Sequence, residues 1–113
     1  MHELSLLENL REIVQTEAER QQFSQVKTLT LEIGSLSCIE TDALRFGFDV
    51  VMQDSPAANA QLIIETLIAT GICQHCEQSM TMHNLQQCCE HCGQFGVTLQ
   101  QGNSMRIKDM LVI

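Results

Sequence analysis

The chain has 113 residues, a size that accommodates one domain or one domain with a small insertion. Its formal net charge is −8, and its only aromatic residues besides histidine are four phenylalanines. A surface of that sign repels phosphate and offers few rings for stacking, so the composition argues against nucleic-acid binding and against an anionic membrane surface.

The first half of the chain shows the periodicities of helices and of one strand. Apolar residues at three- and four-residue steps predict an amphipathic helix over residues 4–19. Residues 27–34 alternate leucine or isoleucine with polar side chains, which predicts a strand with one buried face that ends at Gly34. A second helix is predicted from residue 40 or 41 to residue 52, with Thr41 as its N-cap.

The second half is richer in strand patterns. Residues 60–70 are apolar and β-branched without clear alternation, which indicates a strand covered on both faces. Residues 95–103 and 104–113 predict two strands joined by a turn at Gly102 and Asn103. The order helix, strand, helix, strand, cysteine region, strand, strand indicates an α+β fold.

The sequence contains no feature expected of a membrane or secreted protein. No stretch approaches the roughly 20 apolar residues that a membrane-spanning helix needs. The first residues also lack the basic and apolar runs of a secretory signal. We therefore expect a cytoplasmic protein, in which the six cysteines are metal ligands or free thiols rather than disulfides.

Two CxxC pairs are the strongest chemical signal. Cys73-Gln-His-Cys76 and Cys89-Glu-His-Cys92 are separated by twelve residues. Each CxxC turn lets two sulfurs reach one ion at about 2.3 Å, and two turns complete a tetrahedron. Four thiolates suit zinc and leave no position for a reactant, so a structural zinc site is predicted. The alternative, iron in a rubredoxin-like electron carrier, would be coloured and redox active.

Other cysteines and histidines lie near this motif or apart from it. Cys88 is also spaced to chelate with Cys92, but Cys89 reproduces the spacing of the first pair, so we expect Cys88 to be a spare thiol. Cys38 is expected to be a buried core residue. Three histidines are expected to be exposed, with tuning of the metal site or binding of a second metal as alternatives. They are His75, His83 and His91.

The amino terminus offers a second set of metal donors. The α-amine of Met1, the amide nitrogen of His2 and the imidazole Nδ1 can form adjacent chelate rings, and the Glu3 amide, a carboxylate or water would complete the set. Nitrogen-rich, near-planar coordination suits Ni(II) or Cu(II), whereas zinc prefers a tetrahedron. The alternative is a frayed terminus with an idle histidine.

Catalytic motifs are missing from the sequence. It contains no glycine-rich phosphate loop, no GxSxG elbow and no HExxH pair, because His2-Glu3 is not followed by a second histidine at the required spacing. Acidic pairs such as Glu17 with Glu19 are typical of solvated helix surfaces. We therefore do not expect an enzyme.

Four segments together carry a family resemblance. They are MHELS, LEIGSLSCIETDALRFGFD, the two CxxC pairs with a glycine after the second, and QGNSMRIKDM. With these segments in this order, nearly the whole chain resembles the HypA/HybF family of hydrogenase maturation proteins, which deliver nickel. The resemblance implies a nickel-binding α/β domain with a small three-stranded sheet and two helices, residues 1–70 and 103–113, and an inserted zinc-ribbon-like domain, residues 71–102.

The resemblance also implies which residues bind metal. His2 would be the essential nickel ligand, Glu3 would contribute its backbone amide or side chain, and Glu40 matches an acidic residue that lies near the nickel in the family. Zinc would be held by Cys73, Cys76, Cys89 and Cys92. Cys88 beside the second knuckle and Glu90 in place of a proline depart from the family pattern.

The function implied by the resemblance is that of a nickel metallochaperone. Such a protein binds Ni(II) as transient cargo and passes it to the large-subunit precursor of a [NiFe]-hydrogenase. A nickel-binding GTPase would be its partner, and a homodimer is a further expectation. The alternative function is a zinc-ribbon adaptor that only mediates protein contacts, for which His2 would not be needed.

Overall fold

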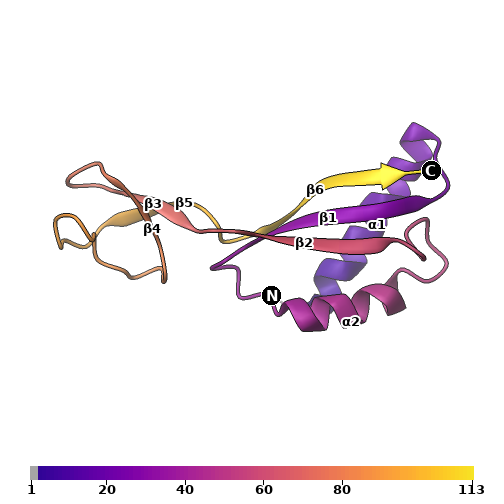
Figure 1. Ribbon diagram of the computed structural model, residues 1–113, viewed down its shortest axis with the longest axis horizontal. Coiled ribbons are helices and arrows are strands. Elements are labelled where there is room, and N and C mark those ends of the chain that lie inside the picture. The colour runs from indigo at the N-terminus through magenta and orange to yellow at the C-terminus, as the bar shows by residue number, and fades with distance from the viewer. Residues whose placement is uncertain (1–2) are drawn as a thin grey trace. The chain divides into compact units, whose positions relative to one another are not determined.

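The computed structural model describes residues 3–113, with two helices and six strands (Figure 1). In chain order they are α1 (Glu3–Gln21), β1 (Val26–Gly34), α2 (Thr41–Val51), β2 (Gln61–Leu67), β3 (Thr70–Cys73), β4 (Ser79–Thr81), β5 (Val97–Gln101) and β6 (Met105–Val112). The strands form two three-stranded sheets, ordered β2-β1-β6 and β4-β3-β5. The α+β class, the two helices and the return of the last strand to the sheet of β1 and β2 are confirmed.

The described residues divide into two compact units. Unit 1 holds residues 3–31, 39–65 and 107–113, and unit 2 holds residues 32–38 and 66–106. A compact unit is defined by its contacts, whereas a functional domain is defined by what it binds. The boundaries predicted for the nickel- and zinc-binding domains therefore stay a prediction. Neither helix within residues 3–113 has the length and apolarity needed to cross a membrane.

The core of unit 1 is formed by apolar faces of the helices and of β1. α1 lies behind the strands in Figure 1 and packs against α2. The two helices approach closely at Gly47, where an added Cβ would lie 2.7 Å from Leu7 Cδ1. The buried side chains of this core are Leu7, Leu10, Val14, Ala18, Val26, Leu29, Leu31, Leu44, Phe48 and Met52.

The carboxyl end of α2 is capped by a side chain of α1. The guanidinium of Arg11 donates hydrogen bonds to the carbonyl oxygens of Val51 and Gln53, both at 2.6 Å, and to that of Asp54 at 3.5 Å. Carbonyls at a helix end have no partner within the helix, so this cation satisfies them and complements the negative end of the helix dipole.

The predicted cap at the other end of α2 is wrong. Thr41 is the first helical residue, and the N-cap is Glu40, whose backbone is extended (φ −80°, ψ 108°) and whose side chain makes no cap hydrogen bond. Threonine is the better local cap, but the backbone N–H of Glu40 is held instead by the carboxylate of Glu3 from α1. A contact between distant residues has overridden the local preference.

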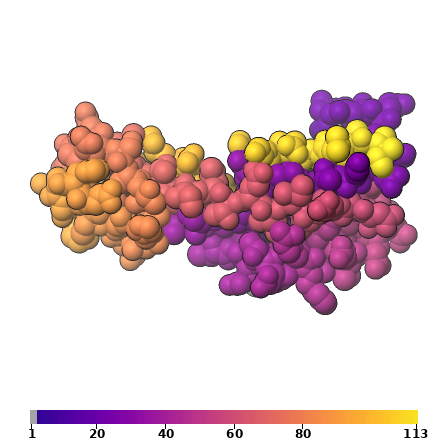
Figure 2. Space-filling model, in the orientation of Figure 1, coloured from indigo at the N-terminus to yellow at the C-terminus, as the bar shows by residue number. Residues whose placement is uncertain are grey.

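One face of β2 is exposed and the other is half-buried, so the prediction that this strand is covered on both faces is wrong. Its residues alternate between exposed and half-buried. Lys108 Nζ of β6 donates to Glu65 Oε1 of β2 at 2.8 Å, and this ion pair spans the central strand β1. Figure 2 shows β6 (yellow) at the surface of the face in view.

The predicted strand over residues 60–70 is divided at a backbone crossing in unit 2, where the chain segments at Gly34, Ala69 and Gly102 come into contact. Ala69 lies between β2 and β3, is fully buried, and donates its N–H to Ser35 Oγ at 2.8 Å. A Cβ added to Gly102 would lie 2.3 Å from Ala69 Cα, and one added to Gly34 would lie 2.2 Å from the Gly102 carbonyl carbon. Three chain segments therefore meet at backbone contact, and the strand breaks because the chain changes sheets here.

The same crossing separates the last two strands. Gly102 turns the chain with φ +104°, as the sequence predicts, but β5 pairs with β3, whereas β6 belongs to the sheet of β1. The two strands are therefore not partners in a hairpin. In unit 2, β3 is central and antiparallel to β4 and β5, with Gly71 opposite Met80 and Leu99.

Candidate metal sites

The first CxxC turn begins at the end of β3. Cys73 donates its N–H to Gln78 O at 3.1 Å, and Glu77 donates its N–H to Cys73 O at 3.0 Å. Glu77 has a left-handed backbone (φ 62°), which lets the chain reverse directly after Cys76. The turn therefore presents the sulfurs of both cysteines on the same side.

The second CxxC turn repeats this geometry sixteen residues later. Cys89 donates its N–H to Gln94 O at 2.9 Å, Gly93 donates its N–H to Cys89 O at 2.8 Å, and Gly93 has φ 76°. Each turn has its left-handed residue immediately after its second cysteine. The two turns are thus equivalent structures, as expected of two zinc knuckles.

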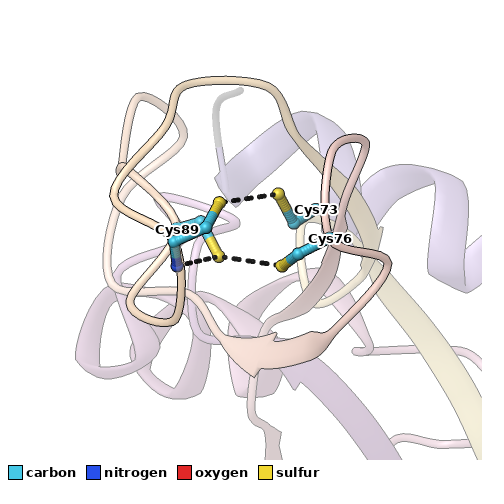
Figure 3. Close-up of side chains that lie close together, drawn as sticks. Cys73, Cys76 and Cys89 are labelled. Atoms are coloured by element: carbon cyan, nitrogen blue, oxygen red, sulfur yellow. Dashed lines mark hydrogen bonds between the residues drawn. The ribbon is translucent and has the colours of Figure 1, made fainter.

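The two turns bring four sulfurs together. The Sγ atoms of Cys73, Cys76, Cys89 and Cys92 all lie within 4.8 Å of one another. Cys73 Sγ is 3.7 Å from Cys92 Sγ, and Cys76 Sγ is 3.6 Å from Cys89 Sγ. Figure 3 shows the side chains of Cys73, Cys76 and Cys89 pointing toward one another from the two turns.

These separations fit a tetrahedral zinc ion. A tetrahedron with metal–sulfur bonds of about 2.3 Å has sulfur–sulfur edges of about 3.8 Å. Soft thiolates in tetrahedral geometry are the donor set that zinc prefers. Within residues 3–113 this is the one group of three or more His, Cys, Asp or Glu side chains close enough to share an ion, and Cys88 lies outside it.

Backbone N–H groups prepare two of the sulfurs for the thiolate state. The N–H groups of Cys76 and His75 lower the pKa of the Cys73 thiol to about 6. The N–H groups of Cys92 and His91 lower the pKa of Cys89 in the same way. Amide N–H groups that point at sulfur stabilise the thiolate, which is the form that binds metal.

The other two thiols hold their protons more tightly when no cation lies between the sulfurs. The Gln78 N–H lowers the pKa of Cys76, but burial and the neighbouring thiols outweigh it and raise that pKa to about 12. The pKa of Cys92 is raised in the same manner, against the effect of the Gln94 N–H. Four crowded sulfurs therefore require a cation before all of them ionise.

The cysteine cluster also serves as the core of its part of the chain. Cys73 is fully buried and Cys89 is 2% exposed, and both pack with Met80 and the half-buried Val97. The apolar side chains here are few, so a metal held by four sulfurs would supply much of the stability of these turns.

The remaining cysteines and histidines do not join the cluster. Cys38 is exposed and has a left-handed backbone (φ 60°), so its prediction as a core residue is wrong. It lies in the link between β1 and α2, outside the periodic pattern that would have buried it. His75, His83 and His91 are exposed, as expected, and His91 Nε2 lies 3.4 Å from Ser79 O.

The amino-terminal donors Met1 and His2 lie outside the described residues. Glu3, the first residue of α1, accepts a hydrogen bond through Oε1 from the N–H of Glu40 at 3.0 Å. The two acidic residues assigned by resemblance to the nickel site thus adjoin each other, although 37 positions separate them. The sequence carried no local signal for this contact.

Comparison with known proteins places the chain among nickel-incorporation proteins. Residues 1–112 match the family model described as HypA, hydrogenase/urease nickel incorporation, metallochaperone. The chain is 40% identical over 112 residues to hydrogenase maturation factor HypA of Psychromonas ingrahamii, covering 99% of this chain and 98% of the relative. It is 41% identical over 113 residues to the HypA factor of Paracoccus denitrificans, along the full length of both chains.

Two further similarities extend this result. The chain is 36% identical over 110 residues to hydrogenase maturation factor HybF of Proteus vulgaris, covering 97% of each chain. Its fold resembles the solution structure of the Ni metallochaperone HypA from Helicobacter pylori with a TM-score of 0.76, at 23% identity and over 100% and 98% of the two chains. The chain therefore belongs to the HypA family of nickel-incorporation metallochaperones.

Proposed function

We propose that this chain carries Ni(II) on its amino-terminal donors and delivers it to the large-subunit precursor of a [NiFe]-hydrogenase. The observation that carries the proposal is the match of residues 1–112 to a nickel-incorporation family, whose relatives are named hydrogenase maturation factors. The motif MHELS at the start of the chain supplies the donors that such a role needs.

The proposed nickel donors are the Met1 α-amine, the amide and imidazole nitrogens of His2, and the Glu3 amide. An amide nitrogen must lose its proton to bind, so nickel affinity rises with pH, and a partner that displaces one donor discharges the metal. The contact between Glu3 and Glu40 supports this arrangement, because it brings a second carboxylate residue to the start of α1.

The cysteine cluster is proposed to hold zinc as a structural ion. Cys73, Cys76, Cys89 and Cys92 would fill all four positions of a tetrahedron, and bound zinc would stabilise the two turns without offering a site for a reactant. The cargo and the structural metal would thus be bound by separate donors of different chemistry, nitrogen for nickel and sulfur for zinc.

The proposed role requires partners but no catalysis. The protein would bind a nickel-binding GTPase and the hydrogenase precursor, and would form a homodimer. It would act in the cytoplasm, where the thiols of its zinc site stay reduced. Delivery changes only the bonds between nickel and its ligands and leaves the covalent bonds of the hydrogenase precursor unchanged. The chain is therefore proposed to be a carrier and not an enzyme.

A genetic complementation experiment tests delivery. Deleting the gene should lower [NiFe]-hydrogenase activity, and excess nickel in the medium should restore part of it. The wild-type chain should complement the deletion, whereas the His2→Ala chain should not. Full complementation by His2→Ala at equal protein level would instead support a zinc-ribbon adaptor that needs no nickel donor.

A further inference from the structure

One face of α2 carries apolar side chains that are exposed. Phe46 is 80% exposed and Val50, one helical turn further on, is 58% exposed, with the exposed Ala43 in the turn before. Positions 43, 46 and 50 have the spacing of a single helix face. A different face of α2, with Leu44 and Phe48, is buried in the core of unit 1. α2 therefore has a second apolar face, which the described part of unit 1 leaves in solvent.

α1 adds one residue to this exposed apolar face. The two helices run in the same direction, because Glu3 at the start of α1 contacts Glu40 at the start of α2, and Arg11 reaches the carbonyls at the end of α2 (Figure 1). Leu4 precedes Arg11 by seven positions, so it lies on the same side of α1, toward α2. Its side chain is 58% exposed. The apolar patch is defined here as Leu4, Ala43, Phe46 and Val50.

The acidic side chains next to the apolar patch form a negative rim. Asp42 and Asp49 lie four residues before and three residues after Phe46, so they adjoin it on the surface of α2. Glu8 lies one turn after Leu4 on α1. All three acidic side chains are exposed, and the ion pairs within residues 3–113 include none of them. Their charge is therefore available to a partner.

The basic side chains of the two helices are engaged elsewhere. Arg11 binds carbonyl oxygens at the end of α2, and Arg45 donates to the Leu62 carbonyl oxygen of β2 at 3.0 Å. Arg20, in the last turn of α1, pairs with Glu17 at 2.9 Å. The surface thus combines exposed apolar side chains with an acidic rim that no arginine of these helices neutralises.

We propose that the apolar patch is a docking surface for an amphipathic helix of a protein partner, with apolar side chains on the contact face of that helix and lysine or arginine along its edges. Two helices that lie side by side offer a groove that a third helix fills. The basic edges would meet the acidic rim, which speeds the encounter and sets the orientation of the helix. The inference goes beyond the delivery role proposed above and does not involve Met1 or His2, so its test is independent of nickel binding.

Charge argues against a second copy of this chain as the occupant. A two-fold contact through the apolar patch would use the same surface on both copies, so their acidic rims would adjoin each other. Each copy has a formal net charge of −8, which adds to the repulsion. A helix with basic edges meets no such repulsion. It can also cover Phe46, and aromatic side chains of this kind contribute strongly to the energy of protein interfaces.

The experiment uses the full-length, zinc-loaded chain and synthetic helical peptides. The first peptide has leucines on one face and lysines along its edges. The second has glutamates in place of the lysines, and the third has glutamines in place of the leucines. Each peptide is titrated into isotope-labelled protein and followed by NMR. The first peptide should shift the amide signals of α2 and of the first turn of α1, and it should bind about tenfold more tightly than either of the others.

Two phenylalanine variants provide the matched comparison. Phe46→Ser removes the largest side chain of the apolar patch, whereas Phe95→Ser removes a phenylalanine of similar exposure, 72%, from unit 2. Phe46→Ser should weaken binding of the first peptide about tenfold, and Phe95→Ser should change it by less than about twofold. Asp42→Asn combined with Asp49→Asn should also weaken this binding, and more strongly at low salt than at high salt. Urea unfolding curves check that each variant is folded.

The other outcomes would overturn the proposal. Equal weakening by Phe46→Ser and Phe95→Ser, or equal binding of all the peptides, would show unspecific adhesion to an acidic protein. Signal shifts confined to residues outside α1 and α2 would place the docking surface elsewhere. If analytical ultracentrifugation of the chain alone shows a dimer that Phe46→Ser dissociates, the occupant of the apolar patch is a second copy, and the partner with basic edges is wrong.

Discussion

Replacing Gly102 by alanine should strongly destabilise the zinc-loaded protein. Gly102 is buried and has φ +104°, and an added Cβ would lie 2.3 Å from the Cα of Ala69. Two carbon atoms in contact prefer a separation of about 3.5–4.0 Å. The backbone of one segment would therefore have to move away by about 1.2 Å or more.

The expected loss follows from two separate terms. The left-handed backbone costs an alanine about 1–2 kcal/mol. The retreat would also stretch two hydrogen bonds at the crossing, from Leu36 N–H to Gly102 O at 2.8 Å and from Met82 N–H to Ala69 O at 2.9 Å. Each is worth about 1 kcal/mol, so the free energy of unfolding should fall by about 3–4 kcal/mol in total.

Gly93 provides the matched control. It also has a left-handed backbone (φ +76°), but an added Cβ would meet nothing within 4 Å. Gly93→Ala should therefore lose only the backbone term of about 1–2 kcal/mol. Urea unfolding of both zinc-loaded variants at neutral pH measures the difference. If Gly102→Ala is no less stable than Gly93→Ala, the close backbone contact between Gly102 and Ala69 is refuted.

Three further predictions concern the metal cluster and the helix pair. Cys88→Ser should keep bound zinc and Cys89→Ser should lose it; the reverse result, by metal analysis, would show that Cys88 is the ligand. Zinc affinity should fall as pH is lowered, because protons compete with zinc for sulfurs such as that of Cys76, whose pKa is about 12 without metal. Competition with a chelator at several pH values measures the affinity, and an affinity that does not depend on pH would contradict the prediction. Arg11→Met should lower the unfolding free energy by about 1–3 kcal/mol, whereas Arg20→Met, which removes an exposed ion pair, should change it far less. Equal losses in urea unfolding would show that Arg11 does not cap α2.

The features predicted correctly from the sequence are those determined by local spacing. The heptad-like steps of residues 4–19 and the alternation of residues 27–34 reflect the period of one element, and α1 and β1 form there. The two CxxC turns are equally local, since each one is closed by its own backbone hydrogen bonds. The resemblance added the return of β6 to the first sheet, which no local pattern indicates.

The errors arise where distant segments decide the structure. Residues 60–70 form one apolar run, and the break near Ala69 depends on glycines more than 30 positions away on either side. Thr41 has the better local propensity to cap α2, but the contact between Glu3 and Glu40 governs that helix start. The residue type of Cys38 favours the core, but no periodic pattern supports that position, and the side chain is exposed.

A nickel titration of the untagged, zinc-loaded chain tests the central proposal most directly. Calorimetry would compare the wild type with His2→Ala and with a chain extended by one residue before Met1, which moves the α-amine away from His2. Both changes should abolish tight nickel binding while zinc content stays the same. Equal nickel affinity in all three proteins would contradict an amino-terminal nickel site.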